Sequence, residues 1–120
     1  MDKDEAPVVI VDDDPDVLRA LSRLLVSMDV PTSTFDSGDA FVAAPLPAPP
    51  TAVLLDLHMP GLRGGELVRA ILHRWPGTRI IVMTGNDRPG SMEEVIGAGA
   101  SAYITKPVEA EDVATLLRHS

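Results

Sequence analysis

The sequence predicts a single α/β domain in which five short parallel strands alternate with five helices. Two observations support this fold class, the order of the predicted elements and the size of the chain. Short aliphatic runs alternate along the chain with segments whose apolar residues recur at helical spacing. Such a βα alternation packs as a parallel sheet covered by helices on both faces. The chain has 120 residues, 45% of them hydrophobic, which is enough for one well-filled core. We therefore expect residues 1–120 to form one domain.

The first strand and helix are the clearest elements. Residues 8–11 are a continuous β-branched run, as expected of a strand buried on both faces. Asp14 and Pro15 then suit the N-cap and the first position of a helix. Its apolar stripe consists of Val17, Leu18, Leu21, Leu24, Leu25 and Met28.

The next elements are less regular. Residues 30–35 predict a weaker strand, and residues 37–43 predict a short helix. The proline-rich segment 45–50 can be neither a helix nor an inner strand, so we expect a stiff surface connection. Residues 53–55 are a buried aliphatic strand that ends at Asp56.

The second half repeats the alternation. Apolar residues between Leu67 and Trp75 predict an amphipathic helix, which Pro76-Gly77 ends. Residues 79–83 predict a strand that ends at Thr84.

The last three elements close the pattern. Residues 91–98 predict a weak helix, because Gly97 and the preceding Pro89-Gly90 lower helix stability. Residues 102–105 predict the fifth strand, which ends at Lys106. A final helix carries Val113, Leu116 and Leu117 on one face.

Reactive side chains follow the predicted strands. Asp12 and Asp13 come after the first strand, Asp56 after the third, Thr84 at the end of the fourth and Lys106 after the fifth. The carboxyl ends of parallel strands share one edge of a sheet, and ligands bind outside that edge. We therefore expect three carboxylates, a hydroxyl and an ammonium group to meet there.

This combination of groups predicts phosphoryl chemistry with a divalent cation. Crowded carboxylates repel one another unless a cation neutralises them. Oxygen ligands without a His or Cys cluster favour Mg²⁺, or Mn²⁺, over zinc. A carboxylate can itself accept a phosphoryl group as an acyl phosphate, and positioning with charge neutralisation supplies most of the catalysis of such a transfer.

Composition excludes several other classes of function. The net charge of −8 argues against direct binding to nucleic acid or to an anionic membrane. The absence of cysteine excludes disulfides and thiol chemistry. The charged N-terminus does not resemble a secretory signal, and no apolar run approaches the roughly 20 residues that span a bilayer. We expect a cytoplasmic location.

The motifs also resemble those of a known family. They are Val11-Asp12-Asp13-Asp14, Asp56-Leu57-His58-Met59-Pro60 with Gly64, Thr84-Gly85, Ala98-Gly99-Ala100, and Tyr103 shortly before Lys106-Pro107. In this order and spacing the chain resembles the receiver domain of two-component response regulators over nearly its full length. The resemblance implies a flavodoxin-like sheet of strand order 2-1-3-4-5. It also implies that this chain contains the receiver domain and no output domain.

The resemblance assigns roles to the residues of the site. Asp56 would be the phosphoacceptor for a sensor histidine kinase or a phosphotransfer protein. Asp13 would bind Mg²⁺ directly, Asp12 largely through water, and His58 through its backbone carbonyl. Lys106 would pair with a phosphoryl oxygen, next to a cis peptide bond before the proline that follows it.

The resemblance also implies a switch. Thr84 would bond the phosphoryl group, and Tyr103 would move from an exposed to a buried position. The face formed by the fourth helix, fifth strand and fifth helix would then change, with a phosphorylation-dependent homodimer as one outcome. His58 and Asn86 would tune the lifetime of the phosphate. Thr84-Gly85 and Tyr103 favour the FixJ-like branch, whose members often control transcription.

Two other functions fit part of the pattern. A phosphatase of the haloacid-dehalogenase type also uses a strand-end Asp with Mg²⁺, but it needs an acid two residues later, where this chain has His58, and a cap for which there is no spare length. A receiver-like scaffold without phosphorylation would not need the acidic pair, the acceptor, Thr84 and Lys106 together. We therefore expect a switch whose only chemistry is on itself, rather than an enzyme.

Overall fold

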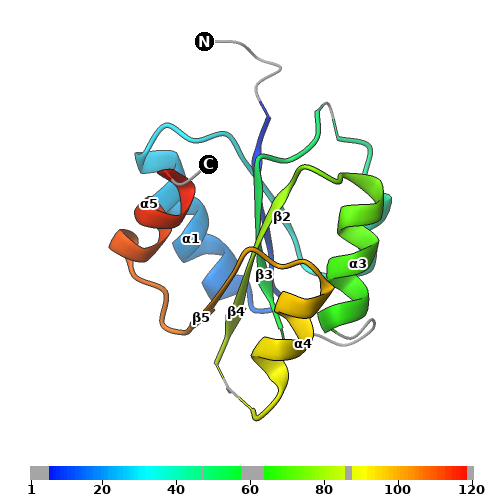
Figure 1. Cartoon of the computed structure of the whole chain (residues 1–120). Helices are drawn as coiled ribbons and strands as arrows, with labels where there is room; N and C mark the ends of the chain where they lie inside the picture. The colour runs from blue at the N-terminus through cyan, green and yellow to red at the C-terminus, as the bar shows by residue number, and fades with distance from the viewer. Residues whose placement is uncertain (1–5, 47, 58–63, 86–87, 119–120) are drawn as a thin grey trace.

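A five-stranded parallel sheet between two layers of helices forms the molecule in this computed structural model, which describes residues 6–46, 48–57, 64–85 and 88–118 (Figure 1). The strands are β1 (Val8–Val11), β2 (Thr32–Phe35), β3 (Ala52–Asp56), β4 (Arg79–Thr84) and β5 (Ala102–Thr105). The helices are α1 (Pro15–Ser27), α2 (Gly38–Ala43), α3 (Gly64–Arg74), α4 (Ser91–Ala98) and α5 (Ala110–Arg118). The strand order is β2-β1-β3-β4-β5, which confirms the predicted topology.

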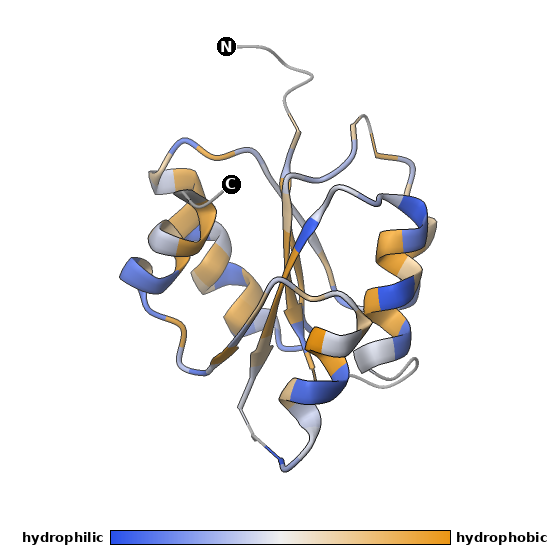
Figure 2. Cartoon of the chain, viewed as in Figure 1, coloured by the Kyte–Doolittle hydropathy of each residue, from blue (hydrophilic) through white to orange (hydrophobic). Residues whose placement is uncertain are grey.

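The sheet separates two apolar clusters. Alternate residues of the central strands point to opposite faces, so Val53 and Leu55 join one cluster while Ala52 and Leu54 join the other. The first cluster packs under α2, α3 and α4, and the second under α1 and α5. Figure 2 shows the apolar colouring concentrated along the strands and on the helix faces that approach them. β1 and β3 are buried along their whole length, so the residues at their carboxyl ends extend directly from the core of the sheet.

The ends of the helices follow from local sequence. Asp14 caps α1, accepting a hydrogen bond from the Asp16 N–H at 2.9 Å, and Pro15 is the first helical residue. The weakly predicted helix at residues 91–98 does form, between Gly90 and Gly99, which adopt positive φ angles of 86° and 119°. Within the part of the chain that the structure describes, no helix combines the length and the apolar character needed to cross a membrane.

The strand predicted over residues 30–35 begins two residues later than expected. The Val30 N–H donates to the Leu25 carbonyl at 3.0 Å, so this residue completes the end of α1. Pro31 has no N–H to donate to a neighbouring strand. Pairing with β1 therefore starts at Thr32, opposite Val8.

Candidate functional site at the carboxyl edge of the sheet

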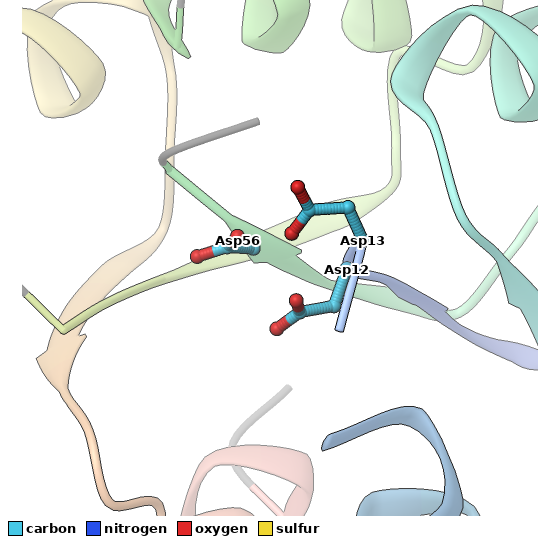
Figure 3. A group of neighbouring side chains, drawn as sticks. All are labelled: Asp12, Asp13 and Asp56. Carbon is cyan, nitrogen blue, oxygen red and sulfur yellow. The ribbon is translucent and has the colours of Figure 1, made fainter. Parts of the chain in front are cut away.

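Three carboxylates meet at the carboxyl edge of the sheet. Asp12 and Asp13 follow β1, and Asp56 ends the neighbouring strand β3. Carboxylate oxygens of all three lie within 4.8 Å of one another, and Figure 3 shows the side chains gathered where the two strands end. Asp12 is fully buried and Asp56 is 6% exposed, whereas Asp13 is exposed. The structure thus brings together the acidic residues that the strand ends predicted.

Asp12 is fixed by contacts on both of its oxygens. Its Oδ1 accepts the Asp14 N–H at 2.9 Å, which folds the chain sharply from β1 towards α1. Its Oδ2 accepts from the Lys106 ammonium, also at 2.9 Å. This buried carboxylate therefore has a defined orientation, in contrast to the exposed Asp13.

Lys106 is the cation of the cluster. Its Nζ lies 2.9 Å from Asp12 and 3.2 Å from Asp56, although the three residues are widely separated in sequence. Partial burial lowers the pKa of Lys106, but the hydrogen bond to Asp12 and the charges of Asp56 and Asp12 outweigh this effect, so the pKa of Lys106 is raised above that of a free lysine. Lys106 is therefore protonated at neutral pH. The Lys106-Pro107 peptide bond is cis, as expected.

Thr84 and Tyr103 lie on neighbouring strands beside this cluster. Thr84 is fully buried at the end of β4, one residue beyond the partner of Asp56 in the sheet. Tyr103 is paired with Val82 and packs against the cluster under α2, α3 and α4. Because Thr84 is two residues after Val82, it faces the same side of the sheet as Tyr103. The two residues therefore share the face that α4 covers.

The donor set fits a small divalent cation. Carboxylate oxygens are the ligands that Mg²⁺ prefers, and the described part of the cluster contains neither histidine nor cysteine. Lys106 neutralises only part of the charge of three carboxylates. Two of the predicted positions, His58 and Asn86, lie outside the residues that the structure describes.

One contact near the site was not foreseen from the sequence. Glu94 of α4 accepts a hydrogen bond from the Gly65 N–H at the start of α3, at 3.0 Å. The consecutive glycines Gly64 and Gly65 were the only sequence signal of a close approach, and nothing identified α4 as the neighbour. The pairing of one lysine with both Asp12 and Asp56 also required the three-dimensional structure.

Sequence comparison finds relatives across nearly the whole chain. The family described as "Response regulator receiver domain" matches residues 8–118. The signal transduction histidine-protein kinase BarA of Escherichia coli K12 is 34% identical over 113 residues, which cover 92% of this chain and 12% of BarA. The transcriptional regulatory protein FixJ of Azorhizobium caulinodans is 31% identical over 114 residues, 95% of this chain and 54% of FixJ. The chain thus spans less than two thirds of either protein.

Comparison of structures finds the same fold. The chemotaxis protein CheY4 of Vibrio cholerae matches with a TM-score of 0.85 and 25% identity, over 94% of this chain and 96% of that protein. The receiver domain of the sensor histidine kinase PA1611 from Pseudomonas aeruginosa PAO1, a structure with a magnesium ion coordinated in the active site cleft, matches with a TM-score of 0.82 and 24% identity, over 94% of each chain.

Proposed function

Because this chain belongs to the response regulator receiver domain family, we propose that it is a phosphorylation-dependent signalling switch with Asp56 as the phosphoacceptor. The observation that carries the proposal is the meeting of Asp12, Asp13 and Asp56 with Lys106 at one edge of the sheet. Of the three carboxylates, Asp56 ends the central strand β3 and lies 3.2 Å from the Lys106 ammonium.

The proposed reaction is a phosphoryl transfer from a phosphohistidine of a sensor kinase or phosphotransfer protein. An Asp56 carboxylate oxygen forms a bond to phosphorus, and the phosphorus–nitrogen bond breaks. The imidazole keeps that electron pair and afterwards takes a proton from solvent. The product is an acyl phosphate on Asp56. Hydrolysis of this acyl phosphate resets the switch, and we assign the tuning of its lifetime to His58 and Asn86.

Each neighbour of Asp56 has a part in that reaction. Asp13 and Asp56 would hold the metal directly and Asp12 largely through water, with the His58 backbone carbonyl as a further ligand. Mg²⁺, or Mn²⁺ in its place, would supply positive charge that neutralises the carboxylates and the incoming phosphoryl oxygens. Lys106, held 3.2 Å from Asp56, pairs with a phosphoryl oxygen once the acceptor is modified.

The change at Asp56 is transmitted to the surface by Thr84 and Tyr103. The Thr84 hydroxyl moves to the phosphoryl group, and Tyr103 fills the space on the same side of the sheet. Phosphorylation thereby biases two pre-existing arrangements of the α4-β5-α5 face. We propose that this face controls an output domain or a partner, including a second copy of the chain, and that the domain itself does not bind nucleic acid. FixJ, a transcriptional regulator, makes transcription a candidate for the regulated process.

Intact-mass measurement with Mg²⁺ and a small phosphodonor such as acetyl phosphate tests the acceptor. We expect the wild-type mass to rise by one phosphoryl group and D56N to stay unmodified. D39N, which changes an exposed aspartate on α2, is the matched control and should be modified like the wild type. Modification of D56N would mean that another residue is the acceptor.

The same sample separates the switch from its two alternatives. An unchanged wild-type mass with several phosphodonors would favour a binding scaffold. Sustained hydrolysis of a generic phosphate ester, far beyond one turnover per chain, would favour a phosphatase. We expect a single modification that decays without such turnover.

A further inference from the structure

The start of α3 is held by a side chain from a different helix. The Gly65 N–H lies in the first turn of α3, where backbone N–H groups have no partner within the helix. It donates instead to Oε2 of Glu94 in α4, at 3.0 Å. A carboxylate is well suited to this place, because the amino end of a helix carries partial positive charge. The bond therefore ties α4 to the beginning of α3.

Two consecutive glycines make this approach possible. A Cβ atom on Gly65 would lie 3.1 Å from Cγ and 3.2 Å from Oε2 of Glu94. A Cβ atom on Gly64 would lie 3.2 Å from the Val95 side chain and would overlap the side chain of Leu57. A side chain at Gly64 would therefore force the Leu57 side chain to move, and one at Gly65 would crowd the Glu94 side chain.

Leu57 connects the contact between α3 and α4 to β3, the strand that ends at Asp56. Leu57 directly follows Asp56, and its N–H donates to the Met83 carbonyl of β4 at 2.9 Å. The Leu57 side chain reaches Gly64, and Gly64 also adjoins the fully buried Val95 of α4. The start of α3 is thus placed between the residue after the acceptor and α4. This connection involves neither Thr84 nor Tyr103.

The hydrogen bond between Glu94 and Gly65 lies near the surface, where it can break and re-form. Glu94 is exposed, whereas its neighbour Val95 is fully buried. Losing the bond would therefore transfer the Glu94 carboxylate to water without uncovering the apolar core. Only the partner of the Gly65 N–H would be lost, so this single contact can differ between two arrangements of α4, which is what a population shift requires.

We propose that Glu94 is a positioning residue that holds α4 against the start of α3 in the unphosphorylated arrangement, in opposition to the phosphorylated one. This inference rests on the proposed function of Asp56 and adds a second connection between the acceptor and the α4 surface. By linkage, a change that weakens the Glu94 contact favours the phosphorylated arrangement, and ligands specific to that arrangement then bind more tightly.

Binding of beryllofluoride, a phosphoryl mimic, in the presence of Mg²⁺ tests the inference. We expect E94A to bind it about fivefold more tightly than the wild type, in the range of known coupling between sites. E93A removes the same charge from the same turn of α4 without touching the bond to Gly65, and should bind like the wild type. Hydrogen exchange at the Gly65 amide should become faster in E94A and stay unchanged in E93A.

A second variant separates coupling from simple loss of stability. G65A introduces a Cβ atom that crowds the Glu94 side chain, and alanine is a better helix former than glycine. Tighter beryllofluoride binding by both E94A and G65A supports the inference, because E94A removes the Glu94 carboxylate whereas G65A keeps it and changes only its contact with the start of α3. Equal or weaker binding by E94A and G65A, with normal binding by the wild type, overturns the inference alone. Absence of binding by the wild type overturns the proposed function as well, and D56N is the control for the site.

Discussion

The three carboxylates of the site occupy different environments, and this difference assigns them different tasks. Asp12 is fully buried, with one oxygen on the Asp14 N–H and the other on Lys106. Asp56 is also paired with Lys106. Asp13 is exposed, so it can turn towards a cation at little cost in packing. We expect Asp13 to control metal affinity while Asp12 controls the orientation of the lysine.

The variant D13N tests this division. We expect its Mg²⁺ affinity to fall by at least about tenfold, or about 1.4 kcal/mol, because an amide oxygen replaces a charged ligand. A rise in melting temperature with Mg²⁺ should be clear in the wild type and nearly absent in D13N.

D14N is the matched control for that measurement. It removes a charge from the adjacent residue, but asparagine caps a helix as well as aspartate does, so the α1 cap is preserved. A normal Mg²⁺ response in D14N and a lost one in D13N supports Asp13 as a ligand. Equal responses in D13N and the wild type would contradict it.

At the scale of single residues, the sequence predicted which side chains meet but not how they pair. Strand ends locate Asp12, Asp56 and Lys106 at one edge, because parallel strands end on the same side. Which carboxylate oxygen the lysine contacts depends on side-chain geometry that spacing does not contain. The Glu94 contact was missed for the same reason, since it joins two helices whose relative placement follows only from packing on the sheet.

Among the elements, α4 is the one that the sequence predicted least firmly, and its glycines explain why. Gly97 lies within the helix, with open space around the position of a Cβ atom. Gly99 ends the helix with a φ of 119°, and a Cβ atom there would overlap the Leu72 side chain. Gly97 therefore only weakens the helix, whereas the backbone conformation at the end of the helix requires Gly99.

Alanine substitutions at the two glycines should have opposite effects. We expect G97A to raise the free energy of unfolding by about 0.5–1 kcal/mol, the usual gain of alanine over glycine inside a helix. G99A should lower it by more than about 1 kcal/mol, because the left-handed backbone and the contact with Leu72 both disfavour a side chain. Denaturant unfolding measures both values. Stabilisation by G99A would show that the helix end can rearrange.

The last helix is anchored at its carboxyl end by the first residue of β4. Arg79 donates to the carbonyls of Leu116 and Leu117, at 2.6 and 3.1 Å. These carbonyls belong to the last turn of α5, where a cation also interacts favourably with the helix dipole. Arg79 therefore joins α5 to the sheet at the end opposite the acidic site.

Replacement of Arg79 by alanine should loosen α5 selectively. We expect R79A to cost about 1–2 kcal/mol in the free energy of unfolding, in line with charged hydrogen bonds that are partly exposed. Amide exchange should become faster in α5 and stay unchanged in β1 and β3. R23A, which removes an exposed arginine from α1, should leave α5 exchange as it is. Uniformly faster exchange in R79A would indicate a global effect instead.

For the whole molecule, fold class and topology followed from the alternation of strands and helices, whereas element boundaries did not. Five parallel strands with short connections leave few arrangements once right-handed crossovers are required. The start of β2 moved from Val30 to Thr32 because Val30 bonds to the end of α1. That local competition between a helix end and a strand start is invisible in the hydrophobic pattern.

Helix α4 exposes two apolar side chains to solvent. Met92 and Ile96 are 47% and 42% exposed and lie four residues apart on α4, so they share one face of that helix. This apolar pair belongs to the α4-β5-α5 face that we propose to change on phosphorylation. Val26, 63% exposed, lies on α1 in the opposite helix layer.

If the switch acts through a second copy of the chain, Mg²⁺ with beryllofluoride should double the mass measured by light scattering. A glutamate at Ile96 should then keep the chain monomeric, because two like charges would be brought together in an apolar contact. V26E adds the same charge to a more exposed apolar residue in the other layer and should still allow the dimer. Dimerisation that persists in I96E but fails in V26E would place the interface on the α1 side. A mass that never changes would mean that the switch does not act through a second copy of the chain.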